Sequence, residues 1–205
     1  MAYCTVTELA EHLGLVDNIT AGVVTVGPER TEKYQRAIDA ASTMLDEDTG
    51  RRFTATEAGT VRYFVPNHLN VLRISDVVTV TEIKVDDDGD GTYETTLTTT
   101  DYELGSLHTD NSTWPYDRVQ RISSTWPIPS PSGRQRLIKI TGTWGWSSVP
   151  VPIKQACLIS AARILQRGGS PLGVSGSVDF GAYMVRNTDP DYQALIAPYR
   201  KMGVA

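Results

Sequence analysis

Several hallmarks of common protein classes are missing from this chain of 205 residues. Its two cysteines, Cys4 and Cys157, lie far apart and belong to no metal-ligand motif, so we expect two reduced thiols rather than a disulfide-held secreted scaffold. The start of the chain has neither the basic residues nor the apolar run of a signal peptide. The most apolar stretch, residues 156–165, is too short to cross a membrane and contains Arg163. These absences favour a protein of a cytosol-like compartment with no membrane partner.

The sequence also lacks the arrangements that most enzymes need. Its histidines, His12, His68 and His108, have no cysteine or second histidine at metal-ligand spacing. The Gly-x-Ser-x-Gly nucleophile motif is absent, and so are the Gly-rich motifs that bind phosphates and dinucleotides. We therefore predict no enzymatic activity and no cofactor.

The sequence has fewer basic than acidic side chains. The formal net charge is −5, which gives no general attraction to nucleic acid or to anionic membranes. Residues 1–58 carry twice as many acidic as basic side chains, whereas residues 147–205 carry twice as many basic as acidic ones. These opposite charges could attract each other within one subunit or between neighbouring subunits.

Helical periodicity is present near the start of the chain. A capping box formed by Thr5 and Glu8 predicts a short helix that stops at Gly14. Pro28 suits the first position of a longer amphipathic helix that ends near Gly50. The intervening residues form a polar and valine-rich linker.

The end of the chain is helical as well. After Pro150, an apolar helix with many small residues runs to Gly168. A glycine-rich loop over residues 168–187 leads to Asp189 and Pro190, which cap a last helix, and Pro198 should kink that helix. The loop is too apolar for plain disorder.

The middle of the chain has the texture of β structure, with runs rich in Thr, Val, Ile and Tyr separated by turn residues. The predicted strands lie at residues 61–65, 77–85, 101–104 and 137–141. Residues 126–131 hold three prolines and are predicted to form a loop. We predict an α+β fold, in which residues 1–58 and 147–205 form a small helical bundle and residues 59–146 are an inserted antiparallel β region.

One segment, residues 86–91, begins like a calcium-binding loop, with Asp at positions one, three and five and Gly at position six. Position twelve should hold a bidentate glutamate, but Leu97 stands there. Because β-like runs flank the segment, we interpret it as a solvated hairpin turn and predict no metal, with calcium as the alternative.

Four tryptophans, Trp114, Trp126, Trp144 and Trp146, suggest either a sugar-binding platform or core and loop anchors. Three of them belong to Trp-Pro or Trp-Gly pairs near strand ends, which favours the anchoring role. The alternative keeps open a β-rich binding module, for a sugar or a protein, on a helical base. A hydrolase with an unfamiliar site is a third alternative.

A series of short motifs follows in order along the second half of the sequence, at residues 141–146, 149–156, 161–165, 170–174, 180–182, 186, 189–191 and 197–200. Together with the pattern of residues 34–53, this order resembles the head-to-tail adaptors of actinobacterial siphophages, which are small helical connector proteins beneath the portal. It covers most of residues 1–58 and 141–202, whereas residues 59–140 match only in kind.

This resemblance implies a structural virion protein in the head–tail neck, present in the host cytoplasm during assembly. Its partners would be further copies of itself in a dodecameric ring, the portal protein, and a tail-side neck protein such as a stopper or a tail terminator. DNA would pass through the lumen without specific binding, and no catalysis or cofactor is implied.

The carboxy-terminal segment, residues 168–205, is the predicted contact with a neighbouring subunit or with the portal, because aromatic side chains commonly anchor interfaces. The alternative is that its helix only completes the intramolecular bundle. The candidate interface residues are Leu172, Val174, Phe180, Tyr183, Tyr192, Leu195, Ile196, Tyr199 and Arg200.

Overall fold

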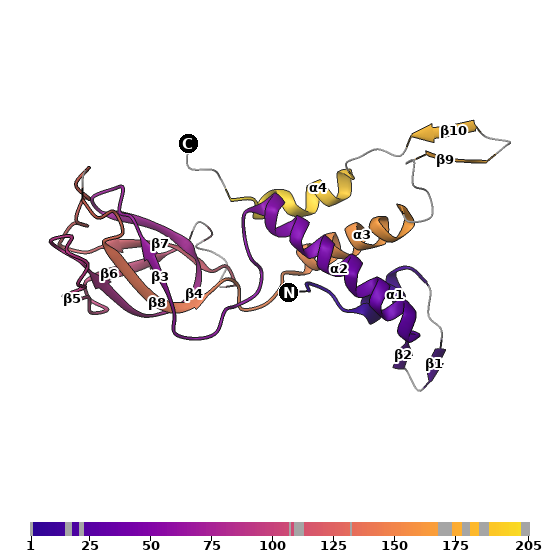
Figure 1. The fold of residues 1–205 in the computed structure, drawn as a ribbon, viewed down its shortest axis with the longest axis horizontal. Helices are drawn as coiled ribbons and strands as arrows, with labels where there is room; N and C mark the ends of the chain where they lie inside the picture. Colours follow the sequence, from indigo (N-terminus) through magenta and orange to yellow (C-terminus); the bar gives the residue numbers. More distant parts are fainter. Residues whose placement is uncertain are drawn as a thin grey trace. The chain divides into compact units, whose positions relative to one another are not determined.

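The computed structural model describes residues 2–14, 18–20, 23–106, 108, 113–131, 133–167, 174–177, 181–184 and 189–201. It has the predicted α+β fold, with helices from both ends of the chain and an antiparallel sheet from the middle (Figure 1). The chain forms two compact units. The helical unit comprises Met1–Arg51 and Val149–Ala205, and the β unit comprises Arg52–Ser148. No helix among the described residues combines the length and the apolar character that crossing a membrane requires.

The first two helices of the helical unit begin and end as predicted. Helix α1 spans Val6–His12, and its capping box is complete because the Thr5 hydroxyl accepts the Glu8 amide while the Glu8 carboxylate accepts the Thr5 amide. Helix α2 spans Pro28–Thr49. Its end is fixed by Gly50, whose left-handed conformation at φ 65° is unfavourable for other residues.

The last two helices of this unit also follow the prediction. Helix α3 spans Val151–Arg167, and helix α4 spans Pro190–Ile196 with the Asp189 side chain as its cap. The predicted kink at Pro198 takes the form of a short 3-10 turn over Ala197–Tyr199. The core between the four helices combines small residues with leucine and isoleucine. Its almost fully buried members are Leu9, Ala10, Ala37, Ile38, Ala41, Leu45, Ile153, Ala156, Cys157, Ala161 and Ile196.

Two short hairpins depart from the sequence prediction. Strands β1 (Asn18–Thr20) and β2 (Val23–Thr25) pair where a linker was expected, and β9 (Val174–Ser177) and β10 (Gly181–Met184) pair inside the glycine-rich loop. Strands of three or four residues show too few alternations for a sequence pattern to reveal them.

The β unit contains one sheet in which every pair of neighbouring strands is antiparallel. Its strand order is β3-β8-β4-β7-β6, and β5 pairs with the end of β4. The strands are β3 (Thr60–Phe64), β4 (Val71–Val85), β5 (Thr95–Thr96), β6 (Tyr102–Gly105), β7 (Tyr116–Arg121) and β8 (Ile138–Trp144). As predicted, the proline-rich residues 126–131 form no strand.

Strand β4 is longer than the prediction, which began it at Val77 rather than Val71. Its first half pairs mainly with β7 and its second half with β8, and its pairing register shifts between Arg73 and Val77. This shift interrupts the alternation of polar and apolar residues on which the sequence prediction depends. The core of the β unit is formed by Leu72, Ile74, Val77, Ile83, Val85, Leu97, Val119, Trp126, Leu137, Ile138, Ile140 and Trp144.

Candidate functional site

The three histidines do not converge on a common site. His12 is an exposed residue at the end of α1, and His68 is exposed in the β unit. The His108 ring lies against Trp114, with ring centroids 3.8 Å apart. Each of these positions suits a surface or structural histidine.

Within the residues that the structure describes, one group of acidic side chains is arranged so that it could hold a cation. The carboxylate oxygens of Asp86, Asp88, Asp90 and Glu94 lie within 4.8 Å of one another. Oxygen ligands of this kind suit calcium. Glu94 is the member that the sequence analysis did not name, although it stands at position nine of the calcium-like pattern.

The same carboxylates hold the turn between β4 and β5 in place. Asp86 is fully buried, and its two oxygens accept the amide hydrogens of Gly89 at 2.7 Å and Gly91 at 2.9 Å. The Asp90 carboxylate accepts the Thr92 amide, and this hydrogen bond lowers the pKa of Asp90 below its ordinary value. The predicted hairpin turn is therefore confirmed, and hydrogen bonds within the turn hold its carboxylates in place.

Three of the four tryptophans are core residues, as predicted. Trp126, Trp144 and Trp146 are at most 2% exposed. Each indole N–H has a partner: Trp126 donates to the Asn70 carbonyl and Trp144 to the Thr60 carbonyl. Trp146 donates to the carboxylate of Asp76, a buried acidic residue in β4. These rings therefore stabilise the β unit.

Trp114 borders a cavity of about 470 Å³ in the β unit, together with Glu103, Tyr116 and Ser147. Its ring packs against His108 on one side, and its edge-on contact with Trp146 has a centroid distance of 4.8 Å. Two protein rings thus contact Trp114, and both would compete with a sugar for stacking against it.

A second cavity, of about 280 Å³, lies in the helical unit between α2, α3 and α4. Its apolar lining includes Met44, which is 45% exposed, and Ile164. Its polar lining includes an ion pair of 2.9 Å between Arg163 on α3 and Asp189 at the cap of α4. This groove is a surface at which a partner could contact three helices at once.

Helix α4 is fixed firmly to the rest of the helical unit. The Tyr192 hydroxyl donates to Asp48 of α2 at 2.7 Å, and burial raises the pKa of Tyr192. Beyond the helix, the Arg51 side chain donates to the Tyr199 carbonyl at 2.8 Å, and the Lys201 amide donates to the Thr49 carbonyl. These bonds join residues 199–201 to the end of α2.

The predicted interface residues fall into three groups. Tyr192 and Ile196 are buried and pack inside the helical unit, whereas Leu195 and Tyr199 are half-buried and Arg200 is exposed. The contacts of the remaining four side chains are not part of what the structure describes. Leu172 and Phe180 lie outside the described residues, and Val174 and Tyr183 lie in β9 and β10, whose side chains are not described.

No protein-family model matches the chain, and no curated protein matches it. Among solved structures, the chain is similar to one from a structure described as "Neck of empty GTA particle computed with C6 symmetry". The TM-score is 0.53 and the sequence identity 20%, and the match covers 99% of this chain and 92% of that chain. The two chains therefore share a fold that includes both the helical unit and the β unit.

Proposed function

We propose that this chain is a structural neck protein of a tailed phage or phage-like particle, in which it forms the adaptor ring between the portal and the tail. The observation that carries the proposal is the fold shared with a chain of a particle neck along 99% of this sequence. The narrower assignment, to the adaptors of actinobacterial siphophages, rests on the sequence resemblance of the two helical segments. Ring formation and portal binding are parts of this proposal.

The helical unit offers the surface for contact between subunits. Arg200 and Lys201 are exposed at the carboxy-terminal end of the unit, while α2 exposes acidic residues that include Glu29 and Glu32. In a head-to-tail ring, two different surfaces of one subunit meet on its neighbours. The basic end of one subunit would then contact the acidic helix surface of the next, with the groove between α2, α3 and α4 beside this contact.

DNA would pass this protein without tight binding. The net charge of −5 opposes the phosphate neutralisation on which general DNA affinity depends. An acidic chain can still line a channel, because repulsion keeps the DNA from adhering to the wall.

The alternative is that the β unit is a ligand-binding module. The cavity beside Trp114 supports it, since about 470 Å³ is enough for a small ligand. The packing of Trp114 against His108 and Trp146 argues against sugar stacking there. We therefore favour the neck role.

The proposal is tested by measuring the mass of the assembly in solution, for the protein alone and mixed with the portal protein of the same particle. We expect a ring in the mixture. Arg200→Glu should weaken ring formation, whereas Arg136→Glu, the same charge reversal at an exposed position of the β unit, should not. A chain that stays monomeric both alone and with the portal would contradict the proposal.

A further inference from the structure

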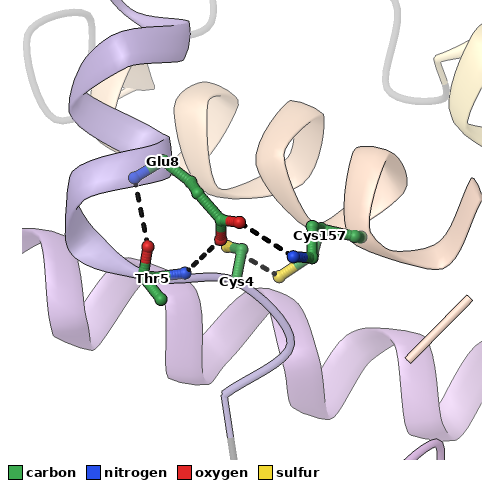
Figure 2. A network of polar contacts seen from close by, with 5 residues as sticks. Cys4, Thr5, Glu8 and Cys157 are labelled. Atoms are coloured by element: carbon green, nitrogen blue, oxygen red, sulfur yellow. Dashed lines mark hydrogen bonds and ion pairs between the residues drawn. The ribbon is translucent and has the colours of Figure 1, made fainter. Parts of the chain in front are cut away.

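The two cysteines of the chain, 153 positions apart in sequence, meet inside the helical unit. Cys4 lies just before α1 and Cys157 lies in α3, and their sulfur atoms are 3.5 Å apart (Figure 2). Both are free thiols, with exposed fractions of 5% and 0%. The packing of α1 against α3 therefore brings together the only two sulfur nucleophiles of the sequence.

The two thiols have different surroundings. The Cys4 thiol donates to the Cys157 sulfur, and the Ser42 hydroxyl lies 3.6 Å from that same sulfur. The hydrogen bond from Cys4 lowers the pKa of Cys157, and the contacts with Ser42 and with the backbone amides of Tyr3 and Cys4 add to this effect, since they stabilise its thiolate. The pKa of Cys4 is raised, first because its thiol donates to Cys157 and then because of burial. Cys157 is thus the better nucleophile of the pair.

The backbone on one side of the pair can adjust. Sulfur atoms in a disulfide are about 2.0 Å apart, so Cys4 and Cys157 need to approach each other by roughly 1.5 Å. Cys4 precedes the cap residue Thr5 and so lies outside the helical hydrogen bonds of α1. Tyr3 keeps the segment in place, because its amide donates to the Ser42 hydroxyl and its own hydroxyl donates to Asp46. A small movement of this short segment would be enough to close the gap.

We propose that Cys4 and Cys157 are a reversible dithiol site, which closes to an intrachain disulfide when a small-molecule disulfide acts as the oxidant. Cys157 is fully buried, so the oxidant reaches it only when the segment that carries Cys4 opens locally. The Cys157 thiol then loses its proton to the solvent, and its thiolate attacks one sulfur of the oxidant and releases one small thiolate. The Cys4 thiol then loses its proton to the solvent and attacks the Cys157 sulfur, which releases the second small thiolate. The protein loses two electrons and two protons, and the small disulfide is reduced to two thiols.

Closing this bond ties the segment before α1 to α3. It also joins two points that enclose most of the chain, so it removes many conformations from the unfolded state and stabilises the helical unit. A particle component moves from a reducing cytoplasm to oxidising surroundings when the cell opens, and the bond would then fix the mature form. That timing rests on the proposed neck role, whereas the chemistry of the pair does not.

The test uses the purified full chain in buffers with graded ratios of oxidised to reduced glutathione, and measures free thiols by alkylation and mass spectrometry. We expect the mass of the folded chain to fall by two hydrogen atoms, with no disulfide-linked dimers. Its melting temperature should rise by on the order of 10 °C. Dithiothreitol should reverse both changes.

The same titration in strong denaturant supplies the reference, because only the folded state holds the two sulfurs together. The folded chain should reach half oxidation at a ratio of oxidised to reduced glutathione at least tenfold lower than the denatured chain does. Cys4→Ser and Cys157→Ser should each abolish the intrachain bond. Retention of both thiols in the folded chain, or oxidation only between chains, would overturn the proposal, and either result leaves ring formation untouched.

Discussion

The Nζ atom of Lys154 lies 2.8 Å from a carboxylate oxygen of Glu8, and this ion pair joins α3 to the first turn of α1 across 146 positions of sequence. Glu8 also completes the capping box of α1. The hydrogen bond from Lys154 is the main reason that the pKa of Glu8 lies below its ordinary value. The Glu8 side chain therefore both caps the start of α1 and holds α1 against α3.

Replacing Glu8 with Gln should remove the charge and retain the cap. A lowered carboxyl pKa stabilises the fold above the ordinary pKa of the group, and this contribution is lost as the pH falls through the lowered value. Because both partners are partly exposed, we expect a loss of at most about 1 kcal/mol near neutral pH. The difference in melting temperature from the native protein should shrink between about pH 5 and pH 3. Glu11→Gln, at an exposed position of the same helix, is the control, and a difference independent of pH would refute this account of Glu8.

Helix α4 should be essential for the stability of the helical unit. Ile196 is fully buried, so Ile196→Ala should lower the free energy of unfolding by about 2–5 kcal/mol. Arg200→Ala, at an exposed position, should change it by less than about 0.5 kcal/mol. Chemical denaturation followed by circular dichroism measures both. Equal effects of the two variants would show that α4 is not packed as described.

Truncation before Asp189 should likewise weaken the cooperative melt, since it removes the ion pair to Arg163 and the Tyr192–Asp48 hydrogen bond. A role of this segment in assembly is therefore tested with surface variants such as Arg200→Glu and not by deletion.

Local chemistry explains why the ends of the chain were predictable. Thr5 and Glu8 form their capping box within four residues, and Pro28 and Gly50 bound α2 because each suits one end of a helix. The β unit was predicted less completely. The strand at Tyr116–Arg121 was missed because four of its six residues are polar or charged, so its alternation is weak.

The candidate sites were harder to foresee than the helices. The contact between Cys4 and Cys157 joins residues that are far apart in the sequence, and no sequence pattern around either cysteine predicts it. Glu94 belongs to the group of carboxylates in the β4–β5 turn because the turn brings it back beside Asp86. The burial of Tyr192 and Ile196 depends on packing against other helices, whereas the sequence shows only that they share an apolar face with Leu195.

The buried carboxylate of Asp86 should be important for the β4–β5 turn. Asp86→Asn replaces one of the two oxygens that accept the amides of Gly89 and Gly91 with an N–H donor. We expect a loss of about 1–3 kcal/mol, measured by chemical denaturation. Asp88→Asn is the matched control, because Asp88 accepts the Asp90 amide through one oxygen, which asparagine keeps. A smaller loss for Asp86→Asn than for Asp88→Asn would contradict this role.

Calcium at micromolar concentration should leave the melting temperature unchanged. The bidentate position of the calcium-like pattern is occupied by Leu97, which is 8% exposed and packs in the core of the β unit. A calcium titration followed by differential scanning fluorimetry checks this. A saturable rise in melting temperature that is absent in Asp88→Ala would show that the β4–β5 turn is a calcium site.

Electron microscopy of the purified protein mixed with its own portal protein tests the proposed neck role most directly. We predict closed rings of this chain stacked on one face of the portal, with an open channel along the common axis. Portal particles with no added density, beside free single subunits of this chain, would contradict the claim.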